Sequence, residues 1–141
     1  LILGEHGDSM VPLWSTARVD GVPLTSLPKY DQGAVMKIFE RTRKSGAEVI
    51  SLKGGAGYAV GVAILEVIKA LAYDTKAILP VSTFLEGEYG LRGVCLSVPT
   101  RLGSKGVEQR LEMELWPKEK AALSASADAL RETMGKVQVK A

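Results

Sequence analysis

Cysteine, histidine and aromatic side chains are scarce in this sequence. It holds one cysteine, one histidine and 6% aromatic residues among 141 positions. A single cysteine, Cys95, cannot form a disulfide within the chain, and its apolar neighbours at 94–98 predict that it fills core space in a reducing compartment. Cys95 and His6 lie too far apart for a zinc site, and the acidic residues at 86–88 lack the companions of a calcium loop. We therefore expect a cytoplasmic protein without a metal site.

Long apolar runs and a strong excess of one charge are also absent. No run reaches the roughly 18 apolar residues of a membrane-spanning helix, and no signal peptide opens the chain. The net charge of +2 is too small to indicate a nucleic-acid partner, and the basic residues between 37 and 44 fall on one solvated face of a helix. The sequence thus predicts neither a membrane nor a nucleic-acid partner. No G-x-S-x-G nucleophile motif appears, and no spacing of acidic residues favours glycoside hydrolysis.

The composition that remains is that of one folded domain. Apolar residues make up 46% and charged residues 24% of the chain. A length of 141 residues suits a single domain with one core. The first residue, Leu1, is not an initiator methionine, so we expect the chain to begin inside a longer protein.

The first half of the chain predicts extended pieces followed by two helices. Residues 11–27 contain two prolines and an Asp-Gly pair at 20–21, which predicts short strands joined by a turn there. Apolar residues at spacings of three and four predict a helix over 31–50, and Gly46 inside it indicates a kink or a close helix contact. Residues 58–73 are apolar nearly all round, so we expect this helix to be the buried centre of the fold.

The second half predicts strands followed by one helix. Residues 76–85 and 94–99 are rich in Ile, Leu and Val and read as two strands, and Pro80 in the first indicates an edge or a bulge. Apolar and charged residues alternate over 107–115, which predicts a half-buried strand. The last helix begins at Pro117, and its predicted inner stripe and C-cap are Leu123, Ala127, Leu130, Met134 and then Gly135. The pattern predicts one α+β domain, with long kinked helices packed on largely antiparallel strands.

The only histidine lies in a polar loop framed by glycines, GEHGDS at 4–9, after three apolar residues that predict the end of a buried strand. Imidazole can both give and take a proton near pH 7, since its unperturbed pKa is about 6.5, so His6 is a candidate acid/base. A loop histidine can equally be an ordinary surface residue. Asp8 lies two positions away, where its carboxylate tends to point away from the ring. A catalytic His6 would therefore need a carboxylate from elsewhere.

The glycine-rich stretch KGGAGYAVG at 53–61 invites comparison with a phosphate-binding loop. Counted from Gly55, the G-x-G-x-x-G pattern needs glycine at 60 but finds Val60, and the stretch follows a predicted helix rather than a strand. We interpret it as a joint between two helices, where small residues leave room for something to approach the backbone.

Several motifs together resemble the L-lactate/malate dehydrogenase family. GEHGDS at 4–9 followed by VPLWS at 11–15 is similar to the active-site histidine signature of that family. Further motifs follow in family order: LKG at 52–54, PVS at 80–82, LEGEYG at 85–90, SVP at 97–99 and GVE at 106–108. The resemblance covers essentially the whole chain. It implies that 1–141 is the C-terminal catalytic domain of such an enzyme, without the NAD-binding Rossmann domain.

The resemblance implies hydride transfer between NAD(H) and a small 2-hydroxy or 2-keto acid, with His6 as proton donor and acceptor. It also implies that Ala56 lies beside the substrate and that Val60 packs against the nicotinamide; the alternative for both is packing of the helix joint. Lactate-specific members usually carry threonine at the position of Ala56, whereas Trp14-Ser15 is more similar to lactate members. The substrate therefore stays open between lactate and malate.

In such enzymes the aspartate that orients the histidine and the arginines that bind the substrate come from the preceding half. The resemblance thus implies that residues 1–141 alone are inactive and need the NAD-binding half. It further implies a dimer or tetramer, with exposed apolar surface where the absent half would lie. The alternative is a non-catalytic structural or assembly module with the same fold, but the retained motif at 4–9 favours an enzyme.

Overall fold

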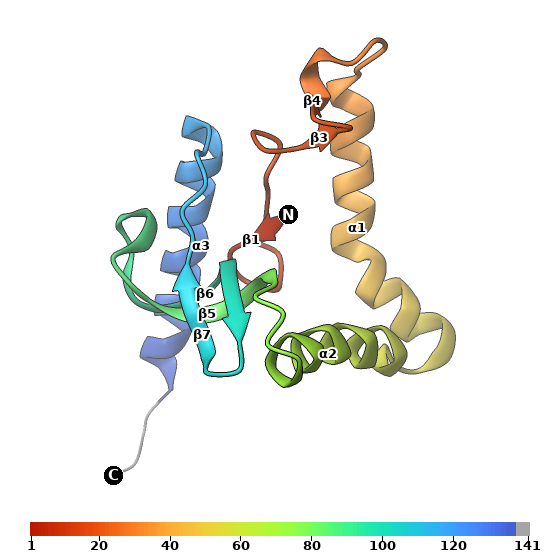
Figure 1. The fold of residues 1–141 in the computed structure, drawn as a ribbon. Coiled ribbons are helices and arrows are strands. Elements are labelled where there is room, and N and C mark those ends of the chain that lie inside the picture. Colours follow the sequence, from red (N-terminus) through yellow and green to blue (C-terminus); the bar gives the residue numbers. More distant parts are fainter. Residues whose placement is uncertain (138–141) are drawn as a thin grey trace.

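The computed structural model describes residues 1–137, which have the predicted α+β architecture. Within this range the helices are α1 (Gln32–Lys53), α2 (Gly57–Ala72) and α3 (Pro117–Lys136), with 3-10 turns at Leu24–Ser26 and Glu88–Gly90. The strands are β1 (Ile2–Leu3), β2 (Val11–Pro12), β3 (Arg18–Val19), β4 (Val22–Pro23), β5 (Ile78–Glu86), β6 (Arg92–Gly103) and β7 (Gly106–Arg110). In Figure 1, α3 and α1 stand on opposite sides of the molecule, with the N-terminal strands between them, and α2 runs across the lower end of α1.

All the strand pairs are antiparallel. The largest sheet has the order β5-β6-β7, while β1 pairs with β2 and β3 pairs with β4 around the turn at 20–21. Pro80 lies in β5, which is an edge strand of its sheet, as its sequence position indicated. The register also shifts between Phe84 and Glu86.

The predicted strand over 107–115 is too long. β7 ends at Arg110, and residues 111–116 have no regular structure. Leu111 still donates a backbone hydrogen bond to Pro99 O at 2.8 Å. Beyond that point the Tyr89 hydroxyl donates to Leu111 O at 3.2 Å and accepts from Met113 N at 2.9 Å. A buried side chain thus takes the hydrogen bonds that a continued strand would have made.

The core lies between β6 and α3. Leu96 and Val98 of β6 are fully buried together with Leu3 of β1, Leu85 of β5 and Leu123 of α3. The prediction for Cys95 is wrong, because its side chain is exposed. Successive residues of a strand point to opposite faces, so a cysteine between two inward-facing residues faces outward.

The prediction that residues 58–73 form the buried centre of the fold is also wrong. They form α2 as expected, but Ala70 is its only buried residue, and most of its larger apolar side chains are exposed. An apolar surface on every side shows that a helix can be buried, yet it does not say which segment covers it. Exposed apolar surface was itself expected, and α2 carries it.

The helix ends follow their capping residues, with one exception. α1 begins after Asp31, whose side chain accepts from Gly33 N at 2.8 Å, and it runs through Gly46 without interruption. α3 begins with Pro117 as predicted. The predicted C-cap at Gly135 is wrong, because α3 continues to Lys136 and its C-cap is Val137. No helix within residues 1–137 is both long and apolar enough to cross a membrane.

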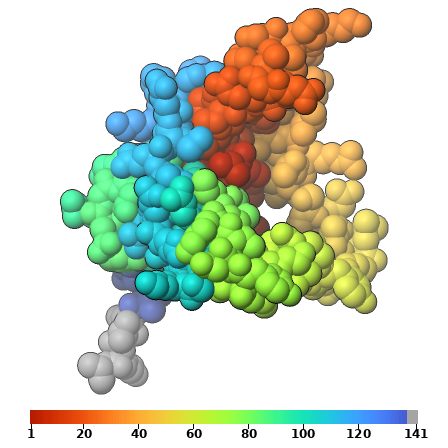
Figure 2. All heavy atoms as spheres, viewed as in Figure 1, coloured from red at the N-terminus to blue at the C-terminus, as the bar shows by residue number. Residues whose placement is uncertain are grey.

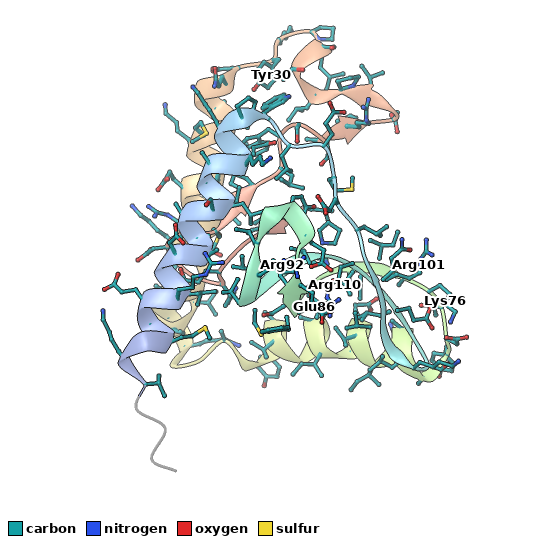
Figure 3. The ribbon with its side chains drawn as sticks, turned by 90° about the vertical axis from the view of Figure 1, so that its left-hand side faces the viewer. Tyr30, Lys76, Glu86, Arg92, Arg101 and Arg110 are labelled. Atoms are coloured by element: carbon teal, nitrogen blue, oxygen red, sulfur yellow. The ribbon has the colours of Figure 1, made fainter. Side chains whose placement is uncertain are left out.

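Ion pairs lie at both ends of the large sheet. Arg110 of β7 lies 3.2 Å from the Glu86 carboxylate of β5, and the two are labelled close together in Figure 3. Lys76, at the far end of the sheet in that view, lies 2.7 Å from Asp74. These groups are partly exposed, so water screens the pairs and each contributes little to stability.

Candidate functional site

The His6 loop is fixed to the large sheet at its beginning. It follows β1, whose Leu3 is fully buried. The next residue, Gly4, donates to Ser97 O at 2.9 Å and accepts from Ser97 N at 3.1 Å. Two hydrogen bonds to β6 therefore set the direction in which the chain leaves the core toward His6, whose side chain is exposed.

A second attachment joins the loop to α3. Glu5 N donates to the Ser126 hydroxyl at 2.8 Å, and the hydroxyls of Ser126 and Ser9 lie 3.0 Å apart. The Ser9 hydroxyl also donates to the Glu5 carboxylate. The residues on both sides of His6 are thereby held against one buried position of α3.

A third attachment joins the loop to α1. Arg43 donates to Asp8 O at 3.3 Å, and its guanidinium lies 3.7 Å from the Asp8 carboxylate and 2.8 Å from that of Glu40. Asp8 is thus paired with Arg43, and within residues 1–137 the His6 ring makes no hydrogen bond. This arrangement matches the expectation that Asp8 does not orient the imidazole.

The three residues singled out from the sequence meet in one pocket. His6, Ala56 and Val60 line a hollow of about 600 Å³ whose other walls are Gly46, Ala59, Ala63, Ile64, Val67 and Ile68. His6 is the single titratable side chain in this lining, and every other wall residue is apolar or glycine. In Figure 2 the dark-red N-terminal residues lie above the green α2 and beside the light-orange and yellow α1. The pocket can therefore hold an apolar group against α2 with the imidazole of His6 beside it.

Two helices meet at the glycine-rich stretch beside this pocket. Ala56 precedes α2, and Gly54 ends α1 in the left-handed conformation, with φ +78°. The glycine-rich stretch is thus a joint between two helices, as predicted, rather than a strand-to-helix phosphate loop. The Lys53 ammonium lies 4.1 Å from the centre of the Tyr58 ring across this joint.

His6 also borders a second, more polar cavity. This space of about 350 Å³ is lined by Gly4, Glu5, Met10, Thr42, Ser45, Pro80 and Ser97 in addition to Ile2, Leu3 and His6. Thr42 and Ser45 of α1 belong to this lining, and their hydroxyls donate to Ile38 O at 2.9 Å and to Thr42 O at 2.7 Å within the helix. His6 therefore lines both an apolar pocket and a smaller, somewhat more polar cavity.

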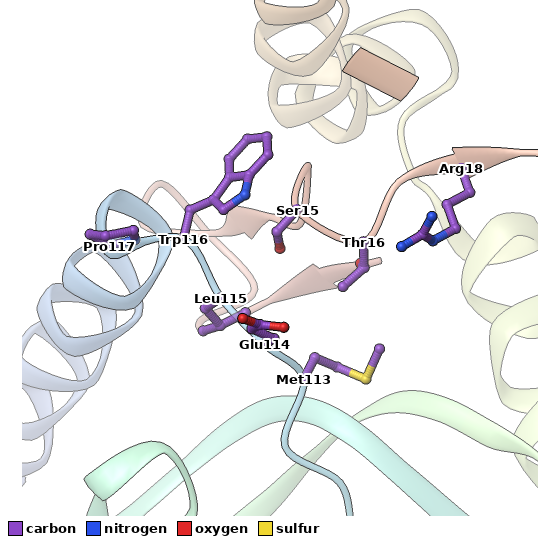
Figure 4. Close-up of a pocket in the computed structure, with 8 residues that line it drawn as sticks. All are labelled: Ser15, Thr16, Arg18, Met113, Glu114, Leu115, Trp116 and Pro117. Atoms are coloured by element: carbon purple, nitrogen blue, oxygen red, sulfur yellow. The ribbon is translucent and has the colours of Figure 1, made fainter. Parts of the chain in front are cut away.

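Another pocket, of about 710 Å³, lies away from these residues (Figure 4). It is lined by Ser15, Thr16, Arg18 and residues 113–117, and it contains none of the predicted site residues. Arg18 donates to Gly21 O at 3.3 Å, within its own hairpin. Its lining holds no histidine, so we assign the candidate site to the His6 pocket.

Sequence reasoning missed two buried polar residues of α3. Glu119 is 6% exposed and accepts from Trp14 N at 2.7 Å, Ser15 N at 3.0 Å and Trp116 N at 2.9 Å. Ser126 is fully buried. Both lie within four residues of Leu123, on the predicted inner stripe, and a polar residue on an apolar helix face is the signal that could have revealed them.

The charge of Glu119 is stabilised where it lies. Burial by itself raises the pKa of this carboxyl, but hydrogen bonds from Ser15, Trp116 and Trp14 outweigh burial and leave the pKa below its ordinary value. Glu119 is therefore ionised at neutral pH and holds the segment after β2 against the beginning of α3.

The fold defines a class of protein: an α+β domain whose one histidine lines an apolar pocket. Comparison with known proteins agrees with this class. Residues 1–140 match the family of the lactate/malate dehydrogenase, alpha/beta C-terminal domain. The chain belongs to that family.

Relatives and solved structures of both enzyme types are similar to the chain. It is 46% identical over 134 residues to a malate dehydrogenase of Staphylococcus saprophyticus, and 39% identical over 138 residues to an L-lactate dehydrogenase of a Synechococcus species. These alignments cover 94% and 97% of the chain but 42% and 45% of the relatives. The chain thus spans less than half the length of these relatives.

The fold agrees closely with solved structures. Malate dehydrogenase from Salinibacter ruber superposes with a TM-score of 0.89 at 40% identity, covering 96% of this chain and 44% of that one. A minor L-lactate dehydrogenase from Enterococcus mundtii gives 0.93 at 29% identity, covering 99% and 46%. The predicted fold class is confirmed.

Proposed function

We propose that residues 1–141 are the substrate half of an NAD-dependent dehydrogenase that interconverts a small 2-hydroxy acid and its 2-keto acid. The observation that carries this proposal is the meeting of His6, Ala56 and Val60 in one pocket. A module that served only assembly would not need its single histidine at the mouth of an apolar cleft. Family membership and the names of the relatives support the same reaction.

The chain's own part in the reaction is proton transfer and positioning. Cationic His6 faces the carbonyl oxygen of the keto acid and gives it a proton as the carbonyl carbon is reduced, so that the product is a hydroxyl and His6 is left neutral. In the reverse direction neutral His6 takes the hydroxyl proton. The smaller cavity that His6 also lines accommodates the polar end of the acid.

The apolar pocket fits the nicotinamide end of NAD(H). Gly46, Ala59 and Ala63 leave space, and Val60 and Ile64 offer apolar contact to a flat ring. The bound cofactor supplies or takes up the hydride. Residues 53–61 do not provide a dinucleotide-binding loop, so we propose that a separate NAD-binding half holds the phosphates and that residues 1–141 alone are inactive.

We place oxaloacetate and malate ahead of pyruvate and lactate as substrates. Ala56 leaves more room beside the pocket than threonine would, which suits a keto acid with a second carboxylate. The relative from Staphylococcus saprophyticus, at 46% identity, is named a malate dehydrogenase. We further propose a cytoplasmic homo-oligomer in which partners cover the exposed apolar residues of α2.

The test is NADH oxidation by the full-length protein that carries this chain, with oxaloacetate and pyruvate measured in parallel. His6→Gln keeps the size of the side chain but cannot carry the proton, so we expect kcat to fall at least about 100-fold. Far-UV circular dichroism of the variant checks that the fold is retained. If the His6→Gln variant turns over as fast as the wild type, His6 has no part in the mechanism. If the wild type turns over neither acid, the non-catalytic module is favoured.

A further inference from the structure

The loop that carries His6 is tied to a serine that is completely buried. Ser126 lies inside α3 with 0% exposure, and its hydroxyl accepts the backbone N–H of Glu5 at 2.8 Å. The same hydroxyl lies 3.0 Å from that of Ser9. Glu5 and Ser9 flank His6, so one buried side chain contacts both arms of the loop.

The directions of these hydrogen bonds follow from the number of protons. A serine hydroxyl has one proton, and an ionised carboxylate can only accept. The Ser9 proton goes to the Glu5 carboxylate, so the proton between the two serines must come from Ser126. The result is a closed ring: Glu5 N–H donates to Ser126, Ser126 donates to Ser9, and Ser9 donates back to the carboxylate of Glu5.

The backbone is shaped to bring α3 this close. Gly4 has φ +88°, and a Cβ at this position would lie 2.7 Å from Ser126 Oγ and 3.2 Å from Ser126 Cβ. A side chain at Gly4 would therefore push the loop off α3. Close approach and the hydrogen-bonded ring are two observations of the same contact, one steric and one polar.

We propose that Ser126 is the positioning residue of His6, because its hydroxyl closes the ring that holds Glu5 and Ser9 and thereby limits the directions open to the imidazole between them. The proposal rests on the proposed role of His6 in proton transfer. Ser126 acts through the backbone of Glu5 and does not touch the reactants. A histidine on an untethered loop would sample many directions, and misplacement by about 1 Å can cost up to about 100-fold in rate.

The test compares serine variants of α3 in the full-length protein. Ser126→Ala removes the ring, Ser126→Cys keeps a weaker donor and acceptor, and Ser124→Ala is the matched control, since Ser124 is exposed on the same helix. We expect kcat to fall about 10- to 100-fold in Ser126→Ala, less in Ser126→Cys, and to stay within about twofold in the control. KM for the keto acid should change less than kcat.

Amide hydrogen exchange supplies a readout that does not depend on turnover. In Ser126→Ala the protection factor of the Glu5 amide should fall at least about tenfold, whereas that of the Leu96 amide in the core should not change. Ser9→Ala is a milder change at a half-buried position and should also lower kcat. It keeps the test possible if the Ser126 variants fail to fold.

The outcomes test the positioning role of Ser126 separately from the proposed dehydrogenase function. A graded fall in kcat with loss of Glu5 protection supports positioning. Unchanged kcat in Ser126→Ala and Ser9→Ala overturns it, even if Glu5 loses protection. A wild-type protein without dehydrogenase activity overturns the proposed function and the positioning role together, and the exchange result then shows only that the ring exists.

Discussion

Replacing Glu119 by alanine is the perturbation with the largest predicted effect on stability. Its carboxylate accepts three backbone N–H groups, from Trp14, Ser15 and Trp116, at 2.7 to 3.0 Å. A hydrogen bond to a charged group contributes about 1.5–3 kcal/mol. The three are not additive, and water can reach part of the gap, so we expect a loss of about 3–5 kcal/mol. That is a large share of the roughly 5–15 kcal/mol of a typical domain.

The assay is urea unfolding followed by tryptophan fluorescence. The chain has two tryptophans, Trp14 and Trp116, and both donate to Glu119, so the signal reports on the perturbed region itself. Glu132→Ala is the matched control, because Glu132 lies on the same helix but is exposed, and among residues 1–137 it pairs with Lys136 alone. The control should change the free energy of unfolding by no more than about 0.5 kcal/mol. A Glu119→Ala loss below about 1 kcal/mol would refute the reasoning.

The pH dependence gives the same prediction a second check. The folded-state pKa of Glu119 is lowered by its hydrogen bonds, which outweigh burial, from an ordinary value of 4.5. The unfolded chain therefore takes up the proton first on acidification, and the stabilisation present above pH 4.5 is lost as the pH falls through the folded pKa. The difference between wild type and Glu119→Ala should be full at pH 7 and shrink below pH 4.5. A difference that grows on acidification would show that the pKa is raised.

Two further predictions concern the core and the surface. Leu96 is fully buried, so Leu96→Ala should lower the free energy of unfolding, measured in urea, by about 2–5 kcal/mol. Cys95 is the next residue but is exposed, so Cys95→Ser should change this free energy little. Equal effects of the two substitutions would show that the assigned strand faces are wrong. Residues 1–141 should self-associate in sedimentation and bind an apolar-surface dye, and Val62→Lys should weaken both because Val62 is 62% exposed on α2. A compact monomer that binds no dye would contradict this expectation.

The sequence alone determined the elements whose cause is local. Asp20-Gly21 has the backbone freedom that a tight hairpin turn needs, and Pro117 suits the first turn of a helix, so both were placed from residue type. The glycine-rich joint was recognised because Val60 breaks the phosphate-loop pattern. The resemblance also named His6, Ala56 and Val60, which the structure brings to one pocket.

Only the tertiary structure decided what covers each element and what holds the site. The apolar composition of the helix at 58–73 predicted that it is buried. Burial depends on which segments pack against a helix, and within residues 1–137 the neighbouring segments leave it largely exposed. The end of β7 is set by Tyr89, more than 20 residues earlier in the sequence. Ser126 meets Glu5 across a separation of 121 residues, and no local pattern encodes such a contact. Periodicity shows which face of α3 points inward, whereas packing alone determines that a serine on that face meets the histidine loop.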